Sequence, residues 1–462
     1  MKYLIPENVD IDLLVKNGAT AGVDPFKVNH LLYIIHIISS IPAQNKSIKN
    51  QDGFVPVHAQ TLQRKVRNYN QYLKYLVDTG VLVVNRQYVP GKKSKGYKFA
   101  EKYNSPLTMF QYGKTLTPKS GTRKKLSAEQ QRKYGHLVKW FSPEFTIDQQ
   151  LSRCYIEWEL KVNSTRNYKD RKTYVQQYNR SLASVENFSH RGAIFPTIDD
   201  FGYRFHSPLT NLKSELRNFL KYNGLNLVSI DINNSQPYMS TLLFHPSFWE
   251  TSQSTDVLTH NKIGVNIEDV FNSRRVYDSF IMLCKKANNN KMSDLHRYIG
   301  LVREGTFYEG VAKYTGSEEI SRKEIKAAVF QTLFTHNRFI AQAEAANKRL
   351  FKHHFPDVYD LFSRLKVKDK RTLPKLLQRI ESHKILLGIT KHIAQEQPNL
   401  PIFTIHDSIV TIEGSEAYLM ETMTAQLTRT FGFPPKLTVS HWNPGNVKMS
   451  DDEWFNRTLC RA

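Results

Sequence analysis

A chain of 462 residues, of which 40% are hydrophobic and 12% aromatic, is long enough for two or three domains and too apolar to be intrinsically disordered. Its 65 basic and 42 acidic residues give a formal net charge of +23, which favours a polyanionic partner: nucleic acid or an anionic membrane. The membrane is disfavoured, because no apolar stretch approaches the roughly 18 residues of a spanning helix. Charged residues and Pro6 also interrupt the N-terminal region, where a signal peptide needs an apolar core.

The three cysteines, Cys154, Cys284 and Cys460, form no closely spaced pair. This spacing disfavours a zinc site built on cysteines and is typical of free thiols in a reducing compartment. We therefore expect a cytoplasmic protein without a membrane partner.

The first predicted helix covers residues 26–41, an apolar run long enough for a buried helix. Asp24 and Pro25 are typical of a helix start, and Pro42 is expected to end the helix. A shorter helical pattern occupies residues 55–68.

A third helix is predicted over residues 68–79, where the apolar residues keep helical spacing and Gly80 is a natural terminator. Two strand-like runs follow, residues 81–89 and 96–103. The segment that joins them is rich in turn residues and lysine, which predicts a hairpin with a basic loop.

Three helices followed by a hairpin with a basic loop resemble a winged helix-turn-helix domain. In that family the third helix enters the major groove and the wing contacts phosphate. The resemblance implies that residues 1–110 bind DNA through six side chains, which are Asn70, Gln71 and Lys74 on the third helix and Lys92, Lys93 and Lys95 in the wing. The alternative is a winged helix that contacts protein or serves packing alone.

Residues 111–200 carry less information. Residues 117–136 are polar and strongly basic, which is typical of a linker or an exposed helix. Residues 140–182 have helical character.

Two mostly apolar strands each end in an aspartate. Residues 225–230 lead to Asp231, and residues 402–405 lead to Asp407, which follows His406 near a hairpin turn. A carboxylate at the end of a buried strand costs free energy unless it is paired or binds a cation. Two such carboxylates that converge would hold two magnesium ions about 4 Å apart. Either aspartate alone is equally consistent with a turn or a helix cap.

A basic and aromatic stripe is predicted on a helix between the two aspartates. Arg322, Lys326, Phe330 and Phe334 recur every four residues, so they follow one face. Two cations followed by two rings suit a nucleoside triphosphate, whose phosphates would meet the cations while the rings stack on base or sugar. Taken alone, such a stripe is more often a packing surface.

The order of aspartate strand, basic helix and His-Asp-Ser strand resembles motifs A, B and C of family A DNA polymerases and the related single-subunit RNA polymerases. The resemblance covers residues 200–445. It implies the following roles: Asp231 and Asp407 as metal ligands, Arg322 and Lys326 on the triphosphate with Lys326 also protonating pyrophosphate, Phe330 stacking on the nucleotide, and His406 beside the primer terminus.

Two flanking segments agree with this resemblance. Before the first aspartate, Arg204, Thr210 and Arg217 correspond to template or primer contacts. Before the second aspartate, Gln378 begins a helix in the manner of the family and is expected at the minor groove or primer terminus. Glu381 on the same helix is expected to be exposed rather than close to the metals.

The sequence departs from the family where the sugar and template are read. Gln236 stands where DNA polymerases have a glutamate that blocks the ribose 2′-hydroxyl and RNA polymerases have glycine. Phe334 replaces a tyrosine whose hydroxyl helps RNA polymerases select ribonucleotides. Gln331 replaces a glycine that lets the helix backbone approach a template base. Together these differences favour deoxynucleotides or a relaxed choice of sugar.

The fold expected from the resemblance is an α+β right-hand polymerase with an antiparallel palm sheet, helical fingers and a small helical thumb-like region. The expected domains are residues 1–110, a winged helix; residues 111–200, a basic linker and thumb-like region; and residues 201–462, the palm and fingers.

The function that the resemblance implies is template-directed nucleotidyl transfer with two Mg²⁺ ions, or Mn²⁺ in their place. We favour a DNA-directed DNA polymerase without proofreading, with primase activity as an extension of that function. Its expected partners are a DNA template and primer, nucleoside triphosphates and replication proteins, in a bacterial or phage-infected cell that replicates a phage, plasmid or mobile element.

Two alternatives remain open from the sequence. The first is a DNA-binding replication initiator or regulator whose polymerase-like half is degenerate. The second is a single-subunit RNA polymerase or primase of the same fold. A reverse transcriptase is disfavoured, because the Tyr-X-Asp-Asp hairpin typical of that class is absent from the sequence.

Overall fold

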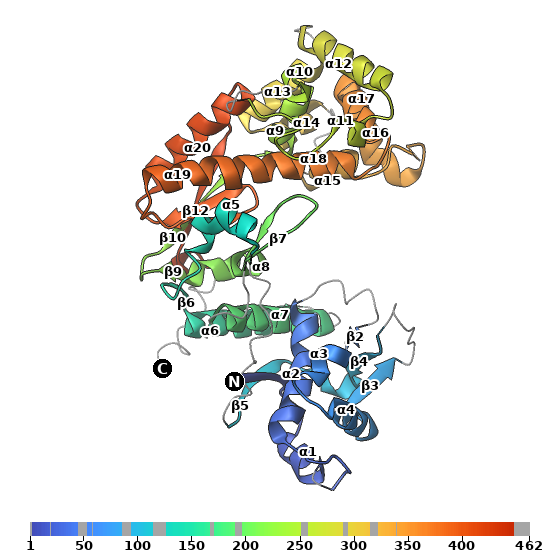
Figure 1. Ribbon diagram of the computed structural model, residues 1–462, viewed down its shortest axis with the longest axis vertical. Helices are drawn as coiled ribbons and strands as arrows, with labels where there is room; N and C mark the ends of the chain where they lie inside the picture. The colour runs from blue at the N-terminus through green and yellow to red at the C-terminus, as the bar shows by residue number, and fades with distance from the viewer. Residues whose placement is uncertain are drawn as a thin grey trace.

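The computed structural model describes residues 2–18, 20–44, 53–57, 59–85, 94–113, 126–166, 171–189, 196–250, 257–289, 294–314, 322–338 and 340–447. Within these ranges the fold is α+β, mostly helical, with small sheets whose strand pairs are all antiparallel (Figure 1). None of the helices in these ranges is long and apolar enough to cross a bilayer.

Residues 2–111, which we call the N-terminal unit, surround a hydrophobic core of their own. Its helices are α1 (Ile11–Gly18), α2 (Val28–Gln44), α3 (Ala59–Gln63) and α4 (Tyr69–Asp78). Its strands are β1 (Lys2–Pro6), β2 (Val55–Pro56), β3 (Leu82–Asn85), β4 (Gly96–Phe99) and β5 (Leu107–Gln111). One sheet has the order β2-β4-β3, and β1 pairs separately with β5. The predicted helices and hairpin correspond in order to α2, α3, α4 and the β3–β4 pair, but α1 was not predicted. Of the helical pattern predicted over residues 55–68, only Ala59–Gln63 is helical and Val55–Pro56 is a strand. Gly80 has the positive φ of 70° expected after α4.

Both ends predicted for the helix over residues 26–41, which is α2 in the structure, were wrong. The helix begins at Val28, because the hydroxyl of Tyr72 on α4 holds the preceding segment in another conformation. It accepts a bond from the Lys27 amide at 2.6 Å and donates to the carbonyl of Pro25 at 3.3 Å. The helix also continues through Pro42 to Gln44. Its last turn is packed into a hydrophobic cluster, and this packing outweighs the hydrogen bond that a proline removes.

Two long helices, α6 (Gln149–Arg166) and α7 (Arg171–Ser189), pack on each other and lie between the N-terminal unit and the rest of the molecule (Figure 1). They confirm the helical character predicted for this region. A small cluster joins α7 to the N-terminal unit and consists of Leu4, Ala43, Leu107, Leu182 and Ala183. The boundaries proposed between the three domains stay a prediction.

The central sheet has four strands in the order β11-β12-β10-β13. They are β10 (Leu227–Ile232), β11 (Phe403–Ile405), β12 (Ser408–Ile412) and β13 (Leu437–Trp442). Side chains of β10 are buried on both faces of the sheet. Ile230 lies in the largest core, whereas Leu227 lies in a second core together with Phe403 of β11 and Val410 of β12. A strand buried on both faces explains the nearly continuous apolar sequence before the first aspartate.

The remaining elements surround this sheet. The short strands are β6 (Phe145–Ile147), β7 (Thr197–Ile198), β8 (Phe205–His206) and β9 (Leu220–Tyr222). The helices between them and the next strands are α5 (Ala128–Val138), α8 (Pro208–Asn211), η4 (Glu215–Phe219), α9 (Ser235–Thr241), α10 (Pro246–Trp249), α11 (Ile267–Val270), α12 (Arg274–Asn289), α13 (Asp294–Glu304), α14 (Phe307–Tyr314), α15 (Arg322–Phe334), α16 (Ala346–His354), α17 (Pro356–Arg364), α18 (Thr372–Ser382), the π-helical η7 (His383–Ile389), α19 (Thr390–Glu396) and α20 (Glu416–Phe431).

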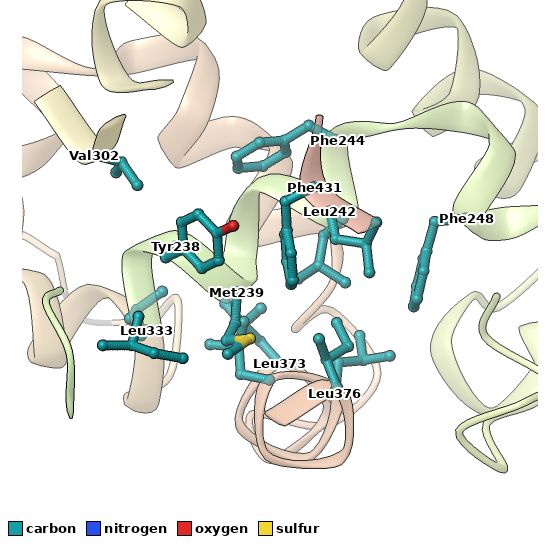
Figure 2. Packing of buried hydrophobic residues seen from close by; sticks show 14 of the residues in the cluster. Tyr238, Met239, Leu242, Phe244, Phe248, Val302, Leu333, Leu373, Leu376 and Phe431 are labelled. Carbon is teal, nitrogen blue, oxygen red and sulfur yellow. The ribbon is translucent and has the colours of Figure 1, made fainter. Parts of the chain in front are cut away.

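One apolar core fixes the helices that matter for the site. Figure 2 shows Met239 of α9 beside Leu373 and Leu376 of α18, with Leu333 of α15 in the same cluster. Burying a leucine or methionine side chain of this kind contributes about 1.5–3 kcal/mol. The first turn after β10, the basic helix α15 and α18 are therefore held in one packed body.

Candidate functional site

Asp231 lies near the end of β10, opposite Ser408 of β12 and Thr438 of β13. Its Oδ1 accepts a hydrogen bond from the hydroxyl of Ser408, and its Oδ2 accepts one from Ser229 at 3.0 Å. Burial raises the pKa of Asp231; the bond from Ser229 opposes this, and the nearby charge of Asp407 adds to it. The carboxylate is thus positioned by two hydroxyls but penalised as an anion, which a bound cation would relieve.

Asp407 follows His406 in the two-residue turn between β11 and β12, where Ile405 pairs with Ser408. His406 has a φ of 56°, in the left-handed region, where a residue other than glycine is strained by about 1–3 kcal/mol. Its buried Nδ1 has no hydrogen-bond partner among the described residues, and burial lowers its pKa. Asp407 therefore sits one residue from the partner of Asp231, at the same end of the sheet.

Glu381 of α18 is the third acid of the site, and the prediction that it is exposed was wrong. Its side chain is 1% exposed and accepts bonds from Arg204 Nε at 3.2 Å and Nη2 at 3.0 Å, and from Gln236 Nε2 at 2.8 Å. Burial raises the pKa of Glu381 to about 7, because it outweighs the attraction of Arg204, and Asp407 raises the pKa further. Glu381 is buried because it follows Leu377 by one helical turn on the core-facing side of α18.

The sequence did not identify the residues that support Arg204. The loop before Arg204 is held by Asp199, whose carboxylate accepts the backbone amides of Gly202 at 2.7 Å and Arg204 at 3.0 Å. Arg379 of α18 binds the same loop from the other side, donating from Nε to the carbonyl of Phe201 at 2.9 Å. The predicted helix placed Arg379 next to Gln378, but only the fold brings it to a loop far away in sequence.

Arg217 of η4 is half-buried near the first aspartate. Burial lowers the pKa of Arg217, and the charge of Asp231 acts in the opposite direction. Its guanidinium lies 5.9 Å from the ring centroid of Trp442. Thr210, by contrast, is used locally: its Oγ1 donates to the carbonyl of Ser207 at 2.8 Å and accepts from the amide of that residue, so it caps α8.

Three residues of the predicted stripe on α15 lie side by side. The rings of Phe330 and Phe334 stack at 5.3 Å and 25°, and the Lys326 Nζ lies 5.7 Å from the Phe330 centroid. The side chain of Arg322 is outside the described residues. In the described part of the chain, no hydrogen bond, ion pair or ring contact joins the stripe to the two aspartates; α15 instead packs against α18, which carries Glu381.

The other predicted contacts lie apart from the aspartates. The prediction that Gln378 begins its helix was wrong: α18 begins at Thr372, and the Gln378 side chain packs against Gly202. Asn70, Gln71 and Lys74 are exposed on α4 as predicted, although Lys74 pairs with Asp78 at 2.7 Å. In the predicted wing, Lys95 is exposed, whereas Lys92 and Lys93 lie outside the described residues.

The donor set at Asp231 and Asp407 fits magnesium better than a metal that needs a complete protein cage. Among the described residues, no group of three or more His, Cys, Asp or Glu side chains is gathered as a metal site. Mg²⁺ usually keeps several waters and binds through one or two carboxylates together with substrate phosphates. A carboxylate also has about four lone-pair sites, so the two hydroxyls on Asp231 leave it free to bind a cation.

Of the comparisons with known proteins, the comparison with solved structures finds a similarity. No protein-family model and no curated protein matches this sequence. Among solved structures, the chain is similar to the POL domain of Pol1 from M. smegmatis in complex with DNA primer-template and dNTP, with 11% sequence identity and a TM-score of 0.28. The similarity covers 62% of this chain and 55% of the length of that chain.

Proposed function

We propose that this protein is a template-directed nucleotidyltransferase, and that it acts as a DNA polymerase without proofreading in the replication or priming of a phage, plasmid or other mobile element. The observation that carries the proposal is the meeting of Asp231 and Asp407 at one end of an antiparallel sheet. These residues are 176 positions apart by their numbers, 407 minus 231, and each ends or follows a buried strand. In this proposal the sheet is the palm and the helical region that contains α15 is the fingers.

Two magnesium ions at these carboxylates would supply an activated 3′-hydroxyl and stabilise the leaving pyrophosphate. The hydroxyls of Ser229 and Ser408 fix the orientation of the Asp231 carboxylate, which would hold one of these ions. Lys326 and Arg322 would bind the triphosphate, and the stacked rings of Phe330 and Phe334 would offer a flat surface to the base or sugar.

Gln236 and Arg204 would border the same nucleotide. Both are held by Glu381, so their positions depend on a buried carboxylate rather than on solvent. The amide of Gln236 carries no charge and so does not indicate a preference for deoxy- or ribonucleotides. Extension assays with each nucleotide set determine that preference.

The N-terminal unit is proposed to be a winged helix that binds duplex DNA. The exposure of Asn70, Gln71 and Lys74 on α4 and of Lys95 supports this proposal. This unit would bring the polymerase to a preferred DNA site.

The first test is extension of a primed DNA template with Mg²⁺ by the wild type and by Asp407→Asn, which keeps the side-chain shape and removes the charge. We expect extension to fall by at least about 10²-fold, because one preorganised electrostatic contact to the reaction is lost. Asp278→Asn, an exposed aspartate of α12 paired with Arg274, is the matched control and should extend normally. Full extension by Asp407→Asn would remove the assigned role.

Two further arms of this assay separate the alternatives. Extension with ribonucleotides alone would identify an RNA polymerase, and products formed without a primer would identify a primase. A DNA-binding initiator with a degenerate site would extend nothing with either nucleotide set.

A further inference from the structure

Two cavities lie end to end along one face of α7. The first, about 800 Å³, lies between α7 and the N-terminal unit. The second, about 670 Å³, lies between α7 and the segment from Pro208 to Arg217. Both are lined by Ala43 and Arg180, so they adjoin at these residues. We call the two together the α7 groove.

The α7 residues that line the groove share hydrogen-bonding side chains. They include Gln176, Gln177, Asn179, Arg180, Ser184 and Asn187. Their spacing follows the helical period, while Leu182 and Val185 are buried on the opposite side of the helix. The helix therefore presents a polar face to the groove. On this face Asn179 already binds the N-terminal unit, accepting from the Leu107 amide at 2.7 Å and donating to the carbonyl of Ser105 at 3.4 Å.

The charge in the second cavity is entirely positive. Its lining contains Arg180, Lys213 and Arg217 and no carboxylate. Outside this lining, Lys213 pairs with Glu159 and, at 3.8 Å, with Glu215. The Nε atoms of Arg180 and Arg217 are buried and have no hydrogen-bond partner among the described residues. A guanidinium in this state is stabilised by a bidentate anion, and phosphate has the matching geometry.

The groove connects two parts of the molecule that bear on nucleic acid. At one end, Phe99 and Tyr103 of the N-terminal unit line the first cavity, and such rings are surfaces on which bases stack. At the other end, Arg217 is close enough to Asp231 for their charges to interact.

We propose that the α7 groove holds a single strand of DNA and leads it from the N-terminal unit to Asp231. From Gln176 to Asn187 the helix rises about 16 Å. Since one strand of duplex DNA carries a phosphate roughly every 3.4 Å of axis and a free strand is more extended, this length spans at most about five phosphates of a single strand. With volumes of about 800 and 670 Å³, the two cavities are too small to enclose a double helix of that length. The identity of the strand as a template or primer rests on the proposed function. The binding of a single strand in the α7 groove is independent of that function.

The test measures binding of a short fluorescent oligothymidylate to the full chain by anisotropy, without magnesium or nucleotides, over a range of salt concentrations. Arg180→Gln should weaken binding at least about fivefold and reduce the slope of log K against log salt by about 0.7, the value for one phosphate contact on a single strand. Asn187→Asp adds a negative charge to the groove without changing side-chain shape, and it should weaken binding in the same direction.

Matched controls lie on α12, away from the groove. Arg274→Gln and Asn289→Asp make the same chemical changes at exposed positions and should bind as the wild type does. Unchanged affinity and slope in both groove variants would overturn the proposal. So would an equal loss of duplex and single-strand binding, because the groove is assigned to a single strand. Should Arg180→Gln fail to fold by thermal melting, the isosteric Asn187→Asp decides.

Failure of the groove and failure of the enzyme give different results. If Asp407→Asn extends primers normally while the groove variants lose the strand, the proposed function fails and the groove stands. If Asp407→Asn is inactive while the groove variants bind normally, the groove is removed and the proposed function stands.

Discussion

Glu381 shows how one buried side chain organises the site. It joins Arg204 and Gln236, which come from different elements, and its charge interacts with Asp407. A buried carboxylate with three donors around it is costly to break, because removal of one partner leaves the others unpaired.

The raised pKa of Glu381 predicts a specific dependence of stability on pH. Since its pKa rises from an ordinary 4.5 to about 7 on folding, the folded state binds the extra proton and the stabilisation is complete below about pH 4.5. It is lost as the pH rises through 7. In Glu381→Gln this component is absent. We therefore expect the unfolding free energy of the wild type, relative to Glu381→Gln, to fall by about 3 kcal/mol between pH 4.5 and pH 8.

Urea unfolding of both proteins across this pH range checks the prediction, and subtraction removes the other titrating groups. A constant difference between the two proteins at every pH would contradict it. The exposed pair variant Glu129→Gln on α5 serves as a control for a solvent-accessible glutamate.

At the scale of an element, two buried lysines from other parts of the chain bind the C-terminal end of α15. Lys366 donates to the carbonyls of Thr332 and Thr335, the latter at 3.1 Å, and Lys348 donates to the Thr335 hydroxyl at 3.3 Å. The bonds from Lys366 satisfy carbonyl groups of the kind that every helix leaves free at its C-terminus. Burial lowers the pKa of Lys366 to about 7, with Lys348 acting in the same direction, so a neutral amine is accessible near neutral pH.

Replacing Lys366 should therefore loosen the end of the proposed nucleotide-binding helix. We expect Lys366→Met, which keeps the apolar stem, to cost about 1–3 kcal/mol because buried carbonyls lose their donor. Lys368→Met, two residues away and exposed, should change stability by less than about 0.5 kcal/mol. Chemical denaturation measures both, and equal stabilities would show that solvent satisfies these carbonyls instead.

The exposed face of α4 and the predicted wing lead to a prediction about how the N-terminal unit recognises a DNA sequence. In duplex binding by the full chain, Lys95→Gln should reduce the salt slope by about 0.9, as expected for one lost phosphate contact. Gln71→Ala should leave the slope unchanged and alter the preference among DNA sequences, because a base contact carries no counterion release. Binding curves on several duplexes at several salt concentrations check this. An identical effect of both changes would contradict the assignment of helix and wing.

At the scale of the whole molecule, much of the architecture was predictable because its signals are local. Gly80 ends α4, and the apolar runs before Asp231 and Asp407 predicted buried strands that meet in one sheet. The predictions that failed depend on contacts between residues that are far apart in the sequence. Glu381 was misplaced because its partner Arg204 lies 177 residues away, and the start of α2 depends on Tyr72, 45 residues later. Helical spacing locates a side chain on a face but does not say what covers that face.

The pairing of β1 with β5 has a consequence for how the chain is made. Lys2–Pro6 finds its partner only when Leu107–Gln111 has been synthesised, and at about 5–20 residues per second this takes roughly 5–20 s. During that interval Leu4 and Ile5, both buried in the finished protein, are exposed on the nascent chain. The short strand, bounded by Lys2 and Pro6, offers other chains little edge to pair with while it waits at the ribosome.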